Sequence, residues 1–346
     1  MDVALQQQQL SFLSKQLDGK TILVTGATGL IGFRLIDLIS ELHVRYNTTI
    51  HGIGIYRDSD KLKKRFPVVP EGIEMYHWDM VVENPPLLPH YDAIVHCAGI
   101  SGGKKMHSKD PRKFFITNVE GTRKLLDFNV NNCVAPFLFL SSYEVYGEID
   151  SINPLDERCP CQIDTYSLRS SYAEMKRMCE MLSCMYSSQY GFNAYSVRLT
   201  STFGAGVEYD DPRFFAEFAR CIITGQDIVL KSTGGTVRSY LDSDDAAIAI
   251  LYVLAKGENC NAYNLTNMDN AISVRDIAER MIDVSGSNIK LKFDLSADNI
   301  KLGYRKECCT LMDSSKLMRL GWKPVYNLND TICKMLTTIN YGYVEE

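Results

Sequence analysis

Tyr172 and Lys176, in the segment Y-A-E-M-K, combine residue types and a spacing suited to proton transfer. On a helix, residues four apart lie on one face, so the ammonium group lies near the phenol. A nearby positive charge favours the phenolate over the phenol, whose pKa is ordinarily about 10, and such a tyrosine can act as a base. The spacing is frequent by chance, and a pair of surface residues is the better explanation in isolation. A catalytic interpretation therefore needs support from elsewhere in the chain.

Three glycines in the spacing G-x-x-G-x-x-G, Gly26, Gly29 and Gly32, supply that support. They follow a short β-branched run at 21–25 and precede a helical pattern of apolar residues at 30–42. Glycine is required where the backbone turns tightly and approaches a pyrophosphate, which the N–H groups at the helix N-terminus then bind. The strand-turn-helix context therefore favours a dinucleotide site over a turn that is merely tight.

The end of the second expected strand bears on the choice of dinucleotide, and it reads Tyr56-Arg57-Asp58. An acidic side chain at this point holds the ribose 2′-hydroxyl of NAD, whereas an arginine accommodates the 2′-phosphate of NADP. Arg57 favours NADP. An arginine before a charged helix is also an ordinary solvated residue, so both NAD and NADP stay open.

Short apolar runs alternate with helical patterns up to about Thr202. Such alternation predicts an α/β fold with a Rossmann-type doubly wound parallel sheet. The expected strands are 21–25, 49–56, 73–76, 93–97, 137–140 and 194–199, and the expected helices include 30–42, 117–128 and 172–190.

The pattern changes beyond Thr202, where helical stretches at 213–224 and 244–255 flank a loop rich in glycine and threonine. This change predicts a smaller C-terminal α/β substrate-binding lobe that packs against the sheet. The expected division is a polar N-terminal extension at 1–17, a Rossmann domain at 18–202 plus about 237–256, and the lobe at about 203–236 and 257–346.

Composition restricts the partners and the compartment. The 346 residues carry a net charge of −5, which argues against nucleic acid as a partner. No stretch approaches the roughly 20 apolar residues that span a bilayer, and the N-terminus lacks the pattern of a secretion signal, so we expect a cytoplasmic protein without membrane contact. Eleven cysteines, an odd number, then indicate reduced thiols. The pairs at 159/161 and 308/309 lack a partner pair at zinc-site spacing, so we expect no metal.

The chain resembles the extended short-chain dehydrogenase/reductase family, in particular its nucleotide-sugar epimerases, dehydratases and decarboxylases. The resemblance covers about residues 18 to 337 and rests on motifs whose combination is specific. In chain order these motifs are T-G-A-T-G-L-I-G, W-D-M, V-H-C-A-G-I, T-N-V-E-G-T, S-S-Y-E-V-Y-G, Y-A-E-M-K, V-R-L-T-S-T-F-G-A-G, R-S-Y-L-D-S-D-D-A-A and L-G-W-K-P. The cofactor contacts that the resemblance implies, together with Arg57, are Gly26, Thr28, Gly29, Leu30, Ile31, Gly32, Asp79, Met80, Cys97, Ala98, Gly99, Asn118, Tyr172 and Lys176.

The resemblance also implies a catalytic set of Ser142, Tyr172 and Lys176. In the family the tyrosine removes the proton of a sugar hydroxyl, usually at C4, while hydride leaves that carbon for the nicotinamide. The serine hydrogen-bonds the same hydroxyl, and the lysine also binds the nicotinamide ribose. The implied contacts to a nucleotide-diphosphate sugar are Ser142, Tyr143, Ser201, the diphosphate-clamping Arg238 and, as a weaker candidate, Arg305.

Two departures from the family pattern leave the reaction after C4 oxidation open. Glu144 is a candidate base at C5, as in dehydratases and decarboxylases, but Tyr143 stands where those enzymes carry a polar proton donor. Glu144 is almost as well explained as a strand-end carboxylate facing water. Ser201 stands where many relatives carry an asparagine. Epimerisation, dehydration and decarboxylation stay open, beside a net NAD(P)H-dependent reductase and a non-catalytic NAD(P)-binding sensor or scaffold.

A homodimer is expected from the family, in which two helices of each subunit pack as a bundle. The matching segments are 117–128 and 172–190. The second segment carries methionines at 175, 178, 181 and 185, and a methionine-rich face is either core or interface.

Overall fold

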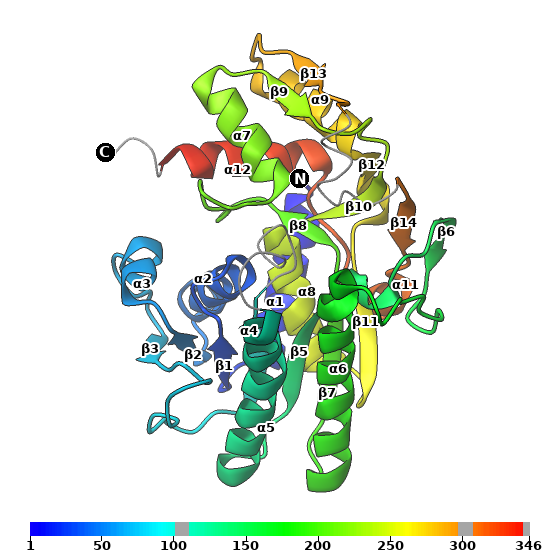
Figure 1. Ribbon diagram of the computed structural model, residues 1–346. Helices are drawn as coiled ribbons and strands as arrows, with labels where there is room; N and C mark the ends of the chain where they lie inside the picture. Colours follow the sequence, from blue (N-terminus) through cyan, green and yellow to red (C-terminus); the bar gives the residue numbers. More distant parts are fainter. Residues whose placement is uncertain (101–110, 297–306, 342–346) are drawn as a thin grey trace.

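A seven-stranded parallel sheet forms the centre of the larger domain in the computed structural model, which describes residues 1–100, 111–296 and 307–341 (Figure 1). The strand order is β11-β7-β5-β4-β1-β2-β3, and every neighbouring pair is parallel. The sheet confirms the expected doubly wound α/β fold. Its strands are β1 (Thr21–Thr25), β2 (His51–Tyr56), β3 (Ile73–His77), β4 (Ala93–His96), β5 (Phe137–Ser142), β7 (Ala194–Leu199) and β11 (Asn261–Leu265).

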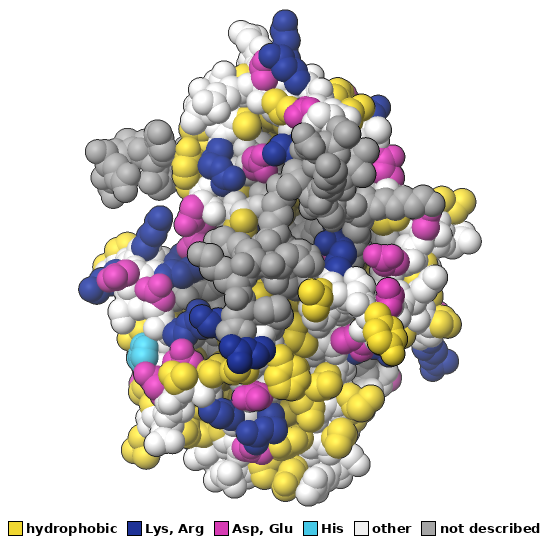
Figure 2. Space-filling view, viewed as in Figure 1, with side chains coloured by type: hydrophobic (Ala, Val, Ile, Leu, Met, Phe, Trp, Pro, Cys, Tyr) yellow, Lys and Arg dark blue, Asp and Glu magenta, His cyan; other side chains and the backbone are white. Residues whose placement is uncertain are grey.

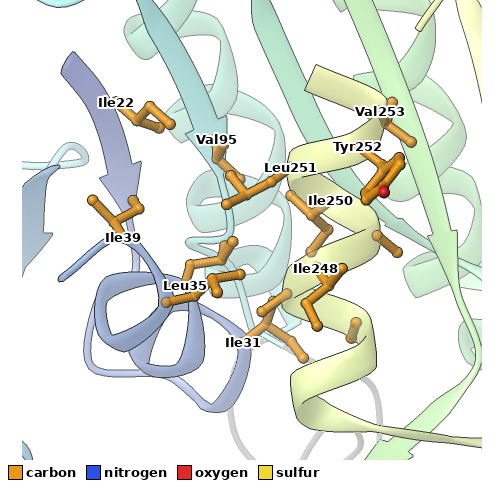
Figure 3. Close-up of a cluster of buried hydrophobic side chains, with 14 of the residues drawn as sticks. Ile22, Ile31, Leu35, Ile39, Val95, Ile248, Ile250, Leu251, Tyr252 and Val253 are labelled. Atoms are coloured by element: carbon orange, nitrogen blue, oxygen red, sulfur yellow. The ribbon is translucent and has the colours of Figure 1, made fainter. Parts of the chain in front are cut away.

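Two layers of helices cover the sheet, because its strands are apolar on both faces. One buried cluster joins α1 (Val3–Gln16), α2 (Leu30–Arg45) and α8 (Ser243–Lys256) to the sheet. Figure 3 shows Ile31 and Leu35 of α2 facing Ile248 and Leu251 of α8. A second cluster lies under the other layer, which contains α5 (Gly121–Asn132) and α6 (Ser171–Tyr190).

The N-terminal segment differs from the polar extension expected at 1–17. It forms α1, whose N-cap is Asp2, and it buries Leu10, Leu13 and Leu17 in the cluster shared with α2 and α8. Two hydrogen bonds link the buried amide of Gln9 to the backbone of Lys323. The segment is therefore part of the core.

The helical region before β5 is longer and less regular than the expected helix at 117–128. It begins with α4 (Pro111–Phe115), passes through a π-helical turn (Ile116–Glu120) and continues as α5. Shorter helical segments among the described residues are α3 (Ser59–Arg65), α11 (Ser315–Met318) and 3₁₀ turns at Tyr143–Tyr146, Leu168–Ser170 and Met268–Asn270.

A second lobe lies above the large sheet in Figure 1. The expected bounds of the two parts do not hold at three strands, because 151–155 and 237–242 belong to the sheet of the lobe, whereas β11 belongs to the large sheet. The lobe holds a five-stranded sheet, with the order β12-β10-β14-β6 and with β8 paired to β10, and a two-stranded sheet of β13 and β9. Its strands are β6 (Ser151–Leu155), β8 (Ser201–Phe203), β9 (Ile228–Leu230), β10 (Val237–Asp242), β12 (Ala271–Ser273), β13 (Leu291–Phe293) and β14 (Cys309–Met312). Its helices are α7 (Phe214–Thr224), α9 (Val274–Ser285) and α12 (Leu328–Tyr341).

The surface seen in Figure 2 intersperses lysine and arginine with aspartate and glutamate. No helix among the described residues is long and apolar enough to cross a bilayer.

The parallel register brings the sequence motifs together at one edge of the sheet. Thr25 at the end of β1 pairs with His96 at the end of β4, and His96 pairs with Phe139 near the end of β5. The segments that follow these strands therefore lie side by side at the carboxyl edge, where ligands bind in open α/β sheets.

Candidate active site

The glycine turn after β1 approaches neighbouring backbone so closely that side chains do not fit. Gly26 has a φ of +68°, and a Cβ there would lie 2.8 Å from the backbone N and Cα of Ala98. A Cβ on Gly32 would lie 2.2 Å from the carbonyl oxygen of Gly26. Gly29 is the N-cap of α2 and makes no side-chain cap, and no acidic side chain lies in the first turn of this helix. The N–H groups at the start of α2 are therefore suited to a pyrophosphate.

The side chains next to these glycines serve packing, which leaves backbone groups to face a ligand. Ile31 is buried in the core, and Leu30 packs against both the large domain and the lobe. The Thr28 carbonyl accepts a hydrogen bond from Arg65 Nε at 3.3 Å.

The segment after β4 joins the glycine turn to the catalytic helix. The N–H groups of Cys97 and Ala98 each donate to Thr25, at 3.2 Å. A Cβ on Gly99 would lie 2.7 Å from Asn118 Oδ1 and 3.9 Å from Lys176 Nζ. The fold thus brings together these residues, which are far apart in sequence.

Lys176 lies on α6 below the end of β5 and is 7% exposed. Its ammonium donates to the carbonyl of Leu140 at 2.7 Å and lies 4.6 Å from the ring centre of Phe139. The ring centre of Tyr172 is 5.8 Å away. Burial lowers the pKa of Lys176 to about 8.

Tyr172 shares the face of α6 with Lys176, as the spacing predicts, but its electrostatics differ from our expectation. We expected the lysine to lower the pKa of the phenol. Instead, burial and the charge of Glu144 raise the pKa of Tyr172 above its usual value, while a hydrogen bond with Ser142 and the charge of Arg213 lower it. The ammonium group donates to the carbonyl of Leu140 and not to the phenol.

Ser142, Tyr143 and Glu144 follow each other at the end of β5 and face the same site. Ser142 Oγ accepts a hydrogen bond from the Glu144 N–H at 3.2 Å and caps the short 3₁₀ turn. The hydroxyl of Tyr143 donates to Glu144 Oε1 at 3.2 Å. Glu144 is half-buried and hydrogen-bonded, so the alternative of a carboxylate facing open water does not describe it.

The lobe places Arg238, on β10, over this segment. Its guanidinium carbon lies 5.1 Å from the ring centre of Tyr143. Burial lowers the pKa of Arg238, but the combined effect of Tyr143, Glu144, Tyr240 and Cys308 raises it above its usual value. Its Nε is buried and has no hydrogen-bond partner in the described part of the chain, so a donor is available to an anionic ligand.

Comparison with known proteins identifies the family. The model of the NAD-dependent epimerase/dehydratase family matches residues 22–266. The chain belongs to this family. UDP-glucuronic acid decarboxylase 5 of Arabidopsis thaliana is 26% identical over 315 residues, which cover 89% of this chain and 86% of the relative. UDP-glucuronic acid decarboxylase 1 of Xenopus tropicalis is 25% identical over 335 residues, which cover 96% of this chain and 74% of the relative.

Solved structures of family members share the fold. UDP-glucuronic acid 4-epimerase of Bacillus cereus, in complex with NAD, superposes with a TM-score of 0.77 at 20% identity, covering 93% of this chain and 99% of the other. dTDP-glucose 4,6-dehydratase of Streptomyces venezuelae gives a TM-score of 0.76 at 22% identity, and the superposition covers 94% of this chain and 99% of the other.

Ser201, Asp79 and Met80, which we expected to face cofactor or substrate in this family member, lie around the same edge. Ser201 begins β8 and pairs with Tyr240, two positions from Arg238 on β10. Asp79 follows β3, where its carboxylate accepts from the Val81 N–H at 2.9 Å, and Met80 packs against the core. Arg305 lies outside the described residues.

Arg57 is exposed at the end of β2, and its carbonyl accepts a hydrogen bond from His77 Nε2 at 3.0 Å. The neighbouring carboxylate of Asp58 caps α3 and accepts from the N–H groups of Asp60 and Lys61, each at 3.0 Å. Asp58 is therefore engaged, whereas the guanidinium of Arg57 forms no hydrogen bond or ion pair within the described part of the chain.

Arg213 is a site residue that the sequence analysis missed. It precedes α7, forms an ion pair with Asp211 at 2.6 Å and lies near enough to Tyr172 to lower the pKa of the phenol. No local pattern in the sequence marks it, because its approach to Tyr172 depends on how the lobe is placed.

Proposed function

We propose that the protein is a nicotinamide-dependent enzyme that transiently oxidises C4 of a UDP-sugar and then catalyses epimerisation, dehydration or decarboxylation. The observation that carries the proposal is the convergence of Ser142, Tyr172 and Lys176 with the glycine turn beneath an arginine from the lobe. The curated relatives, named as decarboxylases of UDP-glucuronic acid, support the substrate class.

The residues have separable tasks in this reaction. When bound, a nicotinamide would supply the hydride acceptor that the oxidation at C4 requires. Tyr172, in its phenolate form, takes the proton of the C4 hydroxyl and becomes the phenol, and Ser142 hydrogen-bonds the same oxygen and steadies the emerging ketone. Because the pKa of Lys176 is lowered to about 8, it exchanges protons near neutral pH and can compensate the charge on the phenolate.

Arg238 holds the diphosphate. Its buried and unpartnered Nε offers a charge-assisted hydrogen bond, and Tyr143 supports its guanidinium from one face. Local groups of this kind bind an anionic ligand to a protein whose net charge is negative.

The Tyr143–Glu144 pair favours a reaction with proton transfer at C5. A C4 ketone acidifies the C5 proton, and Glu144 supplies a carboxylate close enough to Tyr172 to raise the pKa of its phenol. The phenol of Tyr143 donates a hydrogen bond to Glu144. It stands where relatives carry a polar proton donor, and it can itself protonate a leaving hydroxyl.

Glu144→Gln tests this step. We expect deuterium incorporation at C5 from heavy water, followed by NMR, to fall by about 100-fold or more, because the amide is not a base. Oxidation at C4, followed as reduction of bound cofactor, should persist. Glu148→Gln is the matched control, because Glu148 is exposed in the same segment. Unchanged exchange at C5 would remove Glu144 from the mechanism.

Arg57 is the basis for our proposal about the preference between NAD and NADP. NAD is the cofactor in the family description, and the exposed arginine favours acceptance of NADP as well. Arg57→Ala should raise the Michaelis constant for NADP by about tenfold, as for the loss of a charge-assisted hydrogen bond, and change that for NAD little. Steady-state titration with both cofactors measures the two constants, and an equal effect on both excludes the proposed role.

We also propose a cytoplasmic homodimer. Figure 2 shows hydrophobic side chains gathered over α5 and α6, and the exposed fractions of Met178, Met181 and Met185 on α6 are 46%, 65% and 58%. Such a face is suited to a second copy of the chain. All eleven cysteines are free, which is typical of a reducing compartment.

Mass spectrometry of the small molecules released from the purified protein tests the proposed function. We expect a nicotinamide dinucleotide and, on screening UDP, GDP, CDP and dTDP sugars, turnover of a UDP-sugar. A protein that releases and binds a dinucleotide but converts none of these sugars would instead be a sensor or scaffold.

A further inference from the structure

Two thiols face each other at the end of α6 that lies away from the active site. Cys184 is on this helix, and Cys260 lies in the turn between α8 and β11, 76 positions further along the chain. The sulfur of Cys260 is 3.9 Å from the carbonyl oxygen of Cys184 and 3.7 Å from Ser187 Oγ. The thiol of Cys260 is also close enough to that of Cys184 to raise its pKa, so the two side chains are neighbours.

The backbone holds Cys260 in this place. Its N–H donates to the carbonyl of Ala194 at 2.8 Å. The side-chain oxygen of Asn259 accepts from Ser187 Oγ at 3.0 Å and from the Ala194 N–H at 2.8 Å, which docks the turn on α6. Cys260 has a φ of +51°, which is uncommon for a residue with a side chain and persists only where its surroundings impose it.

The two sulfurs differ in how they can react. Cys260 is exposed, whereas Cys184 is partly buried. Burial, the thiol of Cys260 and the charge of Glu180 raise the pKa of Cys184 to about 12. Cys184 is therefore a poor nucleophile towards molecules in solution, and Cys260 is the thiol that they meet first.

We propose that Cys184 and Cys260 form a dithiol site that small disulfides, such as oxidised glutathione, convert to an intramolecular disulfide. The Cys260 thiolate attacks one sulfur of the small disulfide and releases its other half as a thiol. Cys184 then gives up its proton and attacks the sulfur of Cys260, and the second small thiol leaves. Two protein thiols lose two electrons, and the small disulfide gains them.

The cross-link has a structural consequence that does not depend on the proposed function. It ties the helix that carries Tyr172 and Lys176 to the turn that begins the edge strand β11. Because it closes a long loop of the unfolded chain, the oxidised protein should unfold at a higher temperature than the reduced protein.

Peptide mapping of the full-length protein tests the proposal. The protein is incubated with oxidised glutathione, remaining thiols are blocked with iodoacetamide, and peptides are analysed without reductant. We expect a peptide pair linked through Cys184 and Cys260, lighter by two hydrogen atoms than the separate peptides, together with a rise in Tm that a reductant reverses.

Cysteine-to-serine variants test whether the disulfide forms between these two thiols and not between others. Cys184→Ser and Cys260→Ser should each abolish the linked pair and the rise in Tm, whereas Cys333→Ser, a change of another exposed thiol, should keep both. Cys184→Ser should retain a glutathione adduct on Cys260. A stable adduct on Cys260 in the unchanged protein, with Cys184 open to iodoacetamide, or links between other cysteines instead, would overturn the proposal.

Discussion

Tyr172→Phe lowers the rate of sugar oxidation by about 10²–10⁴-fold, because it removes the group that takes the C4 proton and keeps the ring. The ring packs against the second core cluster, so the fold should tolerate the change. The phenol has a raised pKa, which makes its proton harder to remove in the protein alone and makes the reaction sensitive to the charges around it.

The measurement is single-turnover reduction of bound cofactor by a UDP-sugar, followed at about 340 nm. Tyr186→Phe is the matched control: this residue lies on the same helix, and its hydroxyl donates to Asp127 at 2.5 Å, outside the site. The control should keep the rate of the unchanged protein. Undiminished activity in Tyr172→Phe would show that another group is the base.

Gly32→Ala should weaken both the fold and the cofactor site. The new Cβ would lie 2.2 Å from the carbonyl oxygen of Gly26 and 2.9 Å from the Cα of Ala27. These neighbours are backbone atoms, so the first turn of α2 must move. Overpacking of this kind typically costs about 1–3 kcal/mol of unfolding free energy. The N–H groups that bind the pyrophosphate move with the turn, so cofactor affinity falls as well.

Urea unfolding and calorimetric titration with NAD measure the two effects. Gly121→Ala is the control, because its Cβ meets only the Ile116 carbonyl at an ordinary 3.9 Å and the residue lies in a helix. That variant should be as stable as the unchanged protein or more stable. If Gly32→Ala bound NAD with unchanged affinity, the glycine turn would not be the pyrophosphate site.

The central sheet could be predicted from sequence because its strands are continuous apolar runs. The expected strands at 21–25 and 194–199 coincide with β1 and β7. The N-terminal helix could not be predicted in the same way, since its buried face includes Gln9, whose amide is satisfied by a segment more than three hundred positions away.

In the candidate site, too, some features follow from the local sequence and others depend on tertiary packing. Spacing within a strand-turn-helix context predicted the glycine turn, and spacing predicted the shared face of Tyr172 and Lys176, because both follow from local backbone geometry. The direction of the Lys176 ammonium, towards the carbonyl of Leu140, depends on how α6 packs against β5. The raised pKa of Tyr172 depends on that packing and on Glu144, and the approach of Arg213 depends on the placement of the lobe. None of these has a local signal.

The balance of reduced cofactor during turnover tests the central claim most directly. The purified protein, carrying the cofactor that it retains, is mixed with the UDP-sugar that the screen identifies, and absorbance at about 340 nm is recorded while product is quantified. Transient oxidation predicts many turnovers without added cofactor and without a net change in absorbance. Steady loss of added reduced cofactor, one equivalent for each product formed, would identify a reductase and contradict the account.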